Sequence, residues 1–119
     1  MAVDRPTALE LLEAVQEFLQ ERALPRLSGH AAFEARIAAN LLAIARREIE
    51  EGPRLLEEEL AALERLLGSK GTPDELEAEL VALIREGRLA PRWDDLMAHL
   101  RRRAEGRLGI ANPKYLEES

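Results

Sequence analysis

Residues 33–50 read FEARIAANLLAIARREIE, and an α-helix through them places four large apolar side chains on one stripe. Because a helix turns by about 100° per residue, the stripe consists of Phe33, Ile37, Leu41 and Ile44. Asn40 falls within this stripe, which predicts that its amide is buried. An amide buried without a hydrogen-bond partner costs about 1–3 kcal/mol. The sequence therefore predicts a partner for Asn40.

Two interpretations of Asn40 follow from its neighbours. In the first, its amide bonds a loop backbone or another helix and fixes the register of the packing. In the second, Arg36, Asn40 and Arg47 line a site for an anionic ligand or an acidic partner, because guanidinium groups fit carboxylate and phosphate. Helix-edge arginines are commonly solvated, which favours the structural interpretation.

Helix signals continue on both sides of this stretch. Capping boxes are predicted at Thr7 with Glu10 and at Thr72 with Glu75. Glycines and prolines mark stops between the apolar stripes. They predict helices over about residues 8–22, 30–51, 53–67, 73–86 and 93–108, followed by a tail from about residue 110. No segment alternates with the period of a strand. The expected fold is an all-α bundle of about five helices, mostly antiparallel.

Composition limits the class of protein. A chain of 119 residues fits one domain, here residues 1–119. The net charge of −6 and the 3 % aromatic content disfavour nucleic-acid binding. No apolar run is long enough to span a membrane, and the N-terminal residues lack a signal-peptide layout. The absence of cysteine suits a reducing compartment, so we expect a cytoplasmic protein.

The histidines do not indicate a metal site. His30 with Glu34, and Asp95 with His99, are each spaced to share a helix face. The repeated Glu-x-x-His pattern of metal-binding helical bundles is missing. We therefore expect local ion pairs or solvated side chains, no metal and no cofactor.

One basic cluster, HLRRRAEGR, covers residues 99–107. Its cations near a helix C-terminus can simply offset the helix dipole. The alternative is that Arg101, Arg102 and Arg103 form a docking surface for an acidic partner. No nucleophile–base pair, glycine-rich phosphate loop or cysteine nucleophile is present, so the sequence does not predict an enzyme.

Three blocks of the chain resemble a family of short bacterial helical domains of unknown function. The blocks are DRPTALELLEAVQEFL (4–19), FEARIAANLLAIARREIEEGP (33–53) and LMAHLRRRAEGRLGIANPKY (96–115). The family pattern has polar or turn residues at Asp4, Arg5, Pro6, Arg36, Asn40, Asn112, Pro113 and Tyr115. Genes for this family typically lie beside genes for acyl-CoA dehydrogenases and aminoglycoside-phosphotransferase-like kinases. The resemblance carries no assigned catalytic residue.

The resemblance implies a non-enzymatic accessory or interaction protein linked to acyl-CoA metabolism. Its partner would be an acyl-CoA dehydrogenase or a kinase-like phosphotransferase, and wide apolar stripes also allow self-association. The alternative function is binding of a small anionic molecule by Arg36, Asn40 and Arg47. With either function, we also expect the chain ends to pack near the second predicted helix. Asn40 with Arg36 would hold one of these ends in place.

Overall fold

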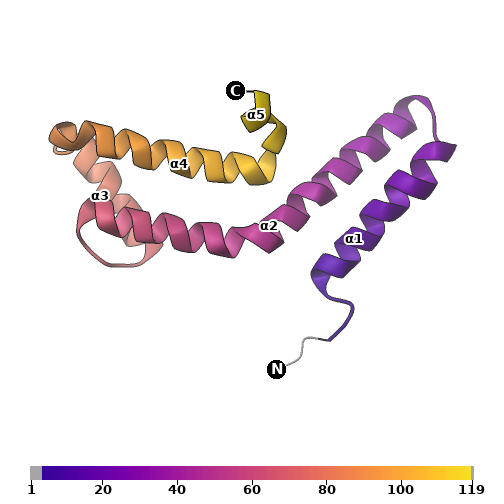
Figure 1. Ribbon diagram of the computed structural model, residues 1–119, viewed down its shortest axis with the longest axis horizontal. Helices are drawn as coiled ribbons and strands as arrows, with labels where there is room; N and C mark the ends of the chain where they lie inside the picture. The colour runs from indigo at the N-terminus through magenta and orange to yellow at the C-terminus, as the bar shows by residue number, and fades with distance from the viewer. Residues whose placement is uncertain (1–3, 119) are drawn as a thin grey trace. The chain divides into compact units, whose positions relative to one another are not determined.

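The computed structural model describes residues 4–118, which form helices and contain no strand over that range. The predicted all-α class is confirmed (Figure 1). Packing divides the chain into two compact units, an N-terminal unit (Met1–Pro53) and a C-terminal unit (Arg54–Ser119). The single domain over residues 1–119 stays a prediction. No helix of the described residues is long and apolar enough to cross a membrane.

The N-terminal unit begins with α1 (Ala8–Phe18). The predicted capping box is confirmed: the Thr7 hydroxyl accepts from the Glu10 backbone N–H, and the Glu10 carboxylate accepts from the Thr7 N–H. The chain then tightens through a π-helical turn (Leu19–Ala23) and a 3-10 turn (Leu24–Arg26). These turns lead into α2.

Helix α2 (Gly29–Leu67) is one helix of 39 residues, with Pro53 inside it. The predicted stop at Gly52 and Pro53 is therefore wrong. Proline removes one backbone hydrogen bond and costs about 3 kcal/mol inside a helix. Gly52 is also a poor helix former, but Glu50 and Glu51 before it and the residues from Arg54 onward are good ones, and their hydrogen bonds offset the missing one. The predicted second and third helices are thus one element.

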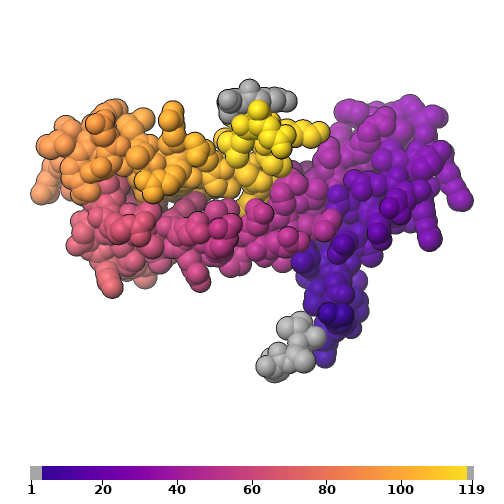
Figure 2. Space-filling view, viewed as in Figure 1, coloured from indigo at the N-terminus to yellow at the C-terminus, as the bar shows by residue number. Residues whose placement is uncertain are grey.

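Small residues line the face of α2 that packs against α1. Ala32, Ala35 and Ala39 are buried, and α1 lies alongside the first half of α2 (Figures 1 and 2). Arg46 lies on the same helix face as these alanines. Its guanidinium donates to the Gln16 side-chain oxygen on α1 at 2.8 Å. The alanine face is therefore the one turned toward α1.

The C-terminal unit contains the second half of α2, α3 (Pro73–Arg85), a 3-10 turn (Ala90–Arg92), α4 (Trp93–Ala111) and α5 (Pro113–Glu118). The second predicted capping box, Thr72 with Glu75, is confirmed at the start of α3. These hydrogen bonds to Thr72 lower the pKa of the Glu75 carboxyl. Leucines from α2, α3, α4 and the segment between α3 and α4 form the core: Leu63, Leu66, Leu76, Leu80, Leu89 and Leu96.

In this unit a glycine ends a helix only where its own φ is positive. Gly68 and Gly87 have φ values of 69° and 71°, and both predicted stops are confirmed. The predicted stop at Gly109 is wrong, because α4 continues to Ala111 and α5 follows within the predicted tail. A glycine in helical conformation costs only about 1 kcal/mol, so it does not end the helix. Pro113 occupies the first position of α5.

Candidate functional site

Of the four large apolar residues in the predicted stripe on the first half of α2, three are exposed and the fourth, Ile44, is half-buried. Phe33, Ile37 and Leu41, which we call the outer stripe, have exposed fractions of 55 %, 43 % and 61 %. At about 100° per residue they lie on the face of α2 opposite the buried alanines. Small side chains therefore face α1, and large ones face outward.

Asn40 lies beside the outer stripe and is also exposed, so the prediction of a buried amide is wrong. Its side chain forms no hydrogen bond within residues 4–53, so the proposed tie between Asn40 and the N-terminal end is not formed in that range. Helix α1 packs on the opposite face of α2, which leaves this amide to water.

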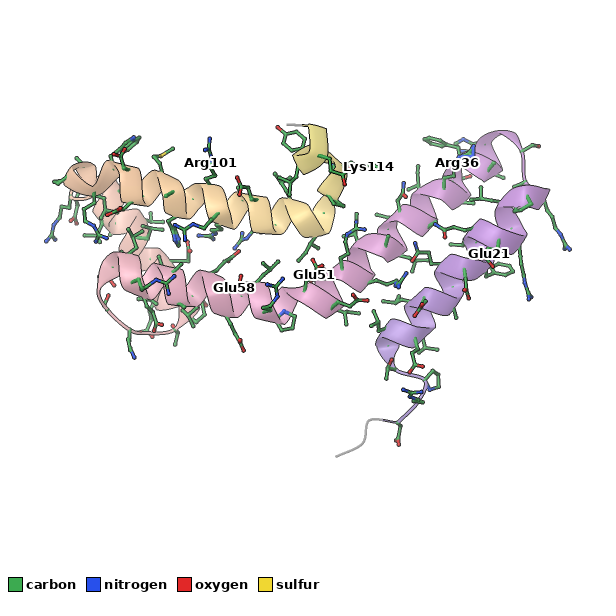
Figure 3. All side chains as sticks on the ribbon, in the orientation of Figure 1. Glu21, Arg36, Glu51, Glu58, Arg101 and Lys114 are labelled. Atoms are coloured by element: carbon green, nitrogen blue, oxygen red, sulfur yellow. The ribbon has the colours of Figure 1, made fainter. Side chains whose placement is uncertain are left out.

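The predicted ligand residues Arg36, Asn40 and Arg47 lie within about 40° of one another around α2, along one edge of the outer stripe. Arg36 is exposed (Figure 3), whereas Arg47 is half-buried and has an interaction partner. The structure brings the three onto one side of the helix. Their role in ligand binding stays a prediction.

A second exposed apolar stripe runs along α1. Leu11, Val15 and Phe18 have exposed fractions of 53 %, 49 % and 54 %. We call these residues the side stripe, because they point to the flank of α1 and not toward the alanine face. The N-terminal unit thus exposes large apolar side chains on both of its helices.

The three predicted docking arginines do not share one surface. Arg101 is exposed and projects from α4 on the side away from α2 (Figure 3). Arg102 lines a cleft. Arg103 is half-buried and forms an ion pair with Glu77 of α3. The docking function of these three arginines stays a prediction, and their side chains do not point in one direction.

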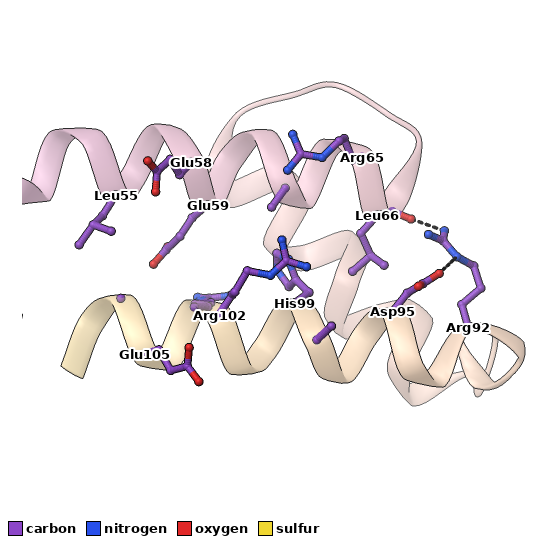
Figure 4. A pocket seen from close by; sticks show the side chains of 14 residues that line it. Leu55, Glu58, Glu59, Arg65, Leu66, Arg92, Asp95, His99, Arg102 and Glu105 are labelled. Carbon is purple, nitrogen blue, oxygen red and sulfur yellow. Dashed lines mark hydrogen bonds and ion pairs between the residues drawn. The ribbon is translucent and has the colours of Figure 1, made fainter. Parts of the chain in front are cut away.

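The cleft lies between the second half of α2 and α4, within the C-terminal unit (Figure 4), and has a volume of about 750 Å³. Its walls combine apolar side chains, including Leu55, Ala62 and Leu66, with arginines and carboxylates from both helices. The sequence did not predict this cleft, because its walls come from segments far apart in the chain.

Ion pairs beside the cleft join the helices of this unit. Arg107 of α4 donates from Nε and Nη2 to the two Glu59 oxygens at 3.1 and 3.0 Å. This bidentate hydrogen bond raises the pKa of Arg107 above its ordinary value. The Arg103 guanidinium donates to the Glu77 carboxylate, so α4 is tied to α3 as well as to α2.

Arg92 closes one end of the cleft. Its Nε donates to the Asp95 carboxylate at 3.3 Å, and its Nη1 donates to the Leu66 carbonyl (Figure 4). Of the alternatives expected for Asp95 and His99, a mutual ion pair is not formed within the described residues, because the exposed Asp95 pairs with Arg92. The predicted pair of His30 with Glu34 is present, with Nε2 and Oε1 3.5 Å apart.

His99 lies in the wall of the cleft and is only 7 % exposed. Its Nε2 atom is buried and has no hydrogen-bond partner among the described residues. Burial lowers the pKa of the His99 imidazole, and the positive charge of Arg103 lowers it further, while Glu77 acts in the opposite direction. We therefore infer that His99 is neutral at pH 7.

The lowered pKa of His99 predicts a pH-dependent stability. Below about pH 6.5, the unfolded chain takes up a proton on this imidazole before the folded chain does. The free energy of unfolding should therefore fall as the pH is lowered from 7.5 to 5.5. In His99→Gln this fall should be smaller, as measured by urea unfolding at each pH. His30→Gln is the control, because it removes an exposed histidine. If both variants alter the pH-dependent fall in the free energy of unfolding equally, the prediction is contradicted.

Comparison with known proteins identifies one family. The family model described as Domain of unknown function (DUF6285) matches residues 25–115 of this chain. No curated protein and no solved structure matches the chain. The match covers the outer stripe, the residues that flank it and the cleft.

Proposed function

Since the chain belongs to this family of uncharacterised domains, we propose that it is a non-enzymatic interaction factor that docks a partner protein through the outer stripe of α2. The single observation that carries the proposal is that α2 buries its small side chains and exposes its large apolar ones. Ala35 and Ala39 are buried on its inner face, whereas Phe33 and Leu41 are more than half exposed. Exposed apolar surface of this kind is typical of binding surfaces.

The exposed area is large enough to contribute strongly to binding. With roughly 150–250 Å² for a large side chain, the outer stripe exposes on the order of 300 Å². Covering it would contribute about 7 kcal/mol at 25 cal/mol per Å², before the costs of association are subtracted. The side stripe on α1 adds a similar area for a partner that contacts both helices.

Polar residues along the stripe indicate the chemistry of the partner. Arg36 and Asn40 are exposed at its edge, where interfaces commonly have a polar rim around an apolar centre. In the free protein water satisfies the Asn40 amide, and in the complex a partner group would do so. We expect an apolar patch bordered by carboxylates on the partner surface, which would pair with the Arg36 guanidinium.

The family resemblance supplies the candidate partners. We propose an acyl-CoA dehydrogenase or a kinase-like phosphotransferase, met in the cytoplasm, because family members are encoded beside such genes. This part of the proposal rests on gene neighbourhood, whereas the docking surface rests on the exposure of the outer stripe.

The test is binding of each candidate enzyme from the same organism, as pure protein, to the full chain and to the variant Phe33→Ser/Leu41→Ser. Because both side chains are already exposed, the thermal midpoint should change little. Affinity should fall by about 100-fold or more, since buried apolar anchors dominate interfaces. Isothermal titration calorimetry measures this change.

Leu56→Ser is the matched control, because Leu56 is 64 % exposed and lies on the same helix but in the C-terminal unit. An equal loss of affinity in this control would contradict docking at the outer stripe. Light scattering of the free chain provides a second test. A stable dimer that Phe33→Ser/Leu41→Ser dissociates would show that a second copy covers the stripe, which would overturn the proposed docking of an enzyme.

A further inference from the structure

Two arginines in the cleft of the C-terminal unit have no counter-ion within residues 4–118. Arg65 comes from α2 and Arg102 from α4, and both line the cleft. In Figure 4 the Arg102 guanidinium extends from α4 toward α2, and the Arg65 side chain lies along α2. Within the described part of the chain, neither guanidinium has a hydrogen bond or an ion pair. Two like charges therefore share one cavity, which is unfavourable until an anion lies between them.

The carboxylates of the cleft do not neutralise this pair. Three of the four are already held by other arginines: Glu58 by Arg54, Glu59 by Arg107 and Asp95 by Arg92. The fourth, Glu105, points away from α2 in Figure 4, whereas Arg102 points toward it. The side of the cleft between the helices thus has an excess of positive charge.

A buried polar atom lies next to these charges. His99 is 7 % exposed, and its Nε2 has no partner in the described structure. Buried polar groups nearly always have a hydrogen-bond partner, so the orphaned nitrogen indicates a missing one. Arg102, which is exposed, lies beside His99 in Figure 4.

We propose that this cleft binds an organic oxyanion, that is, the carboxylate or phosphoryl group of a small molecule. Arg65 and Arg102 grip the anion from opposite walls with charge-assisted hydrogen bonds. His99 donates to it from Nε2, as the neutral imidazole can in one tautomer. Leu55, Ala62 and Leu66 form an apolar wall beside the anion and would contact a short hydrocarbon chain. This site is separate from the outer stripe and does not depend on partner docking.

The experiment follows the imidazole signals of the full chain by NMR during titration with butyrate, inorganic phosphate or butyl phosphate. The chain contains two histidines, so the exposed His30 provides an internal reference for His99. We expect saturable shifts at His99 and none at His30. A bound anion should also raise the pKa of His99, because it favours the imidazolium. Binding of butyrate alone would assign a carboxylate ligand, and binding of either phosphate alone would assign a phosphoryl ligand.

The variant Arg65→Gln/Arg102→Gln should weaken binding by about tenfold or more, given the usual contribution of hydrogen bonds to charged groups. Arg85→Gln/Arg101→Gln is the matched control, because it removes two positive charges from the same unit at residues that do not line the cleft. If none of the three probes shifts the NMR signals of the His99 imidazole, the proposal is overturned. Equal weakening in the two double variants would also overturn it, because binding would then reflect net charge alone.

Discussion

Replacing Leu76 by alanine is expected to destabilise the C-terminal unit by about 2–5 kcal/mol, the usual cost of leaving a cavity in a packed core. Leu76 is 2 % exposed and belongs to the cluster that joins α2, α3 and α4. Leu66 and Leu96 belong to the same cluster, so a cavity at this point removes contacts from all three helices. Domains are commonly stable by only about 5–15 kcal/mol, which makes this a large fraction of the total.

The single tryptophan of the chain, Trp93, lies at the start of α4. Its fluorescence during urea unfolding therefore reports on the C-terminal unit. Val81→Ala is the matched control, because Val81 is on the same helix and 42 % exposed. Val81→Ala should lower the free energy of unfolding by less than about 1 kcal/mol. A Leu76 variant as stable as this control would show that the leucine cluster is not the stabilising core.

The sequence predicted α3 and the leucine core of the C-terminal unit, because the capping signals and the packing agree there. Thr72 begins α3 and Gly87 follows its end, as the capping box and glycine indicate. The apolar stripes that contain Leu63, Leu76 and Leu96 are the ones that the structure buries. In this unit the centre of each stripe has a neighbouring helix to cover it, whereas Ile84, Trp93 and Met97 stay exposed.

The same reasoning failed on the first half of α2. Periodicity identifies the apolar face of a helix but not the element that covers it. The helix has two usable faces: alanines that permit close approach of α1, and the outer stripe of Phe33, Ile37 and Leu41. Within the unit, α1 packs on the alanine face. The predicted core therefore became exposed surface, and Asn40 became exposed with it.

The cleft could be predicted only in part. Arg102 and His99 lie in the basic cluster that the sequence already marked, but Arg65 is an ordinary arginine within a long helix. Only the packing of α4 beside α2 shows that Arg65 and Arg102 share a cavity. The burial of His99 is likewise a tertiary property, because its spacing from Asp95 indicates only that the two residues share a helix face.

Replacing Ala39 by leucine is expected to destabilise the N-terminal unit by about 1–3 kcal/mol, because extra methyl groups in a packed contact force neighbouring atoms apart. Ala39 is 3 % exposed, on the face that holds α1 through Arg46 and Gln16. A larger side chain there would push α1 away and stretch the 2.8 Å hydrogen bond between these two residues. The effect should be confined to the N-terminal unit, which contains no tryptophan, so loss of helical circular dichroism should precede the change in fluorescence.

Ala31→Leu is the control for this variant, because Ala31 is exposed on the same helix. It adds the same atoms without a packed neighbour and should change stability by less than about 0.5 kcal/mol. If Ala39→Leu unfolds like this control, then α1 does not pack closely on the alanines, and the assignment of inner and outer faces on α2 is wrong. If only Ala39→Leu is destabilised, close packing on small residues explains why the large ones face outward. The exposure of the outer stripe is then a consequence of how the unit folds, and its apolar residues remain available to a partner.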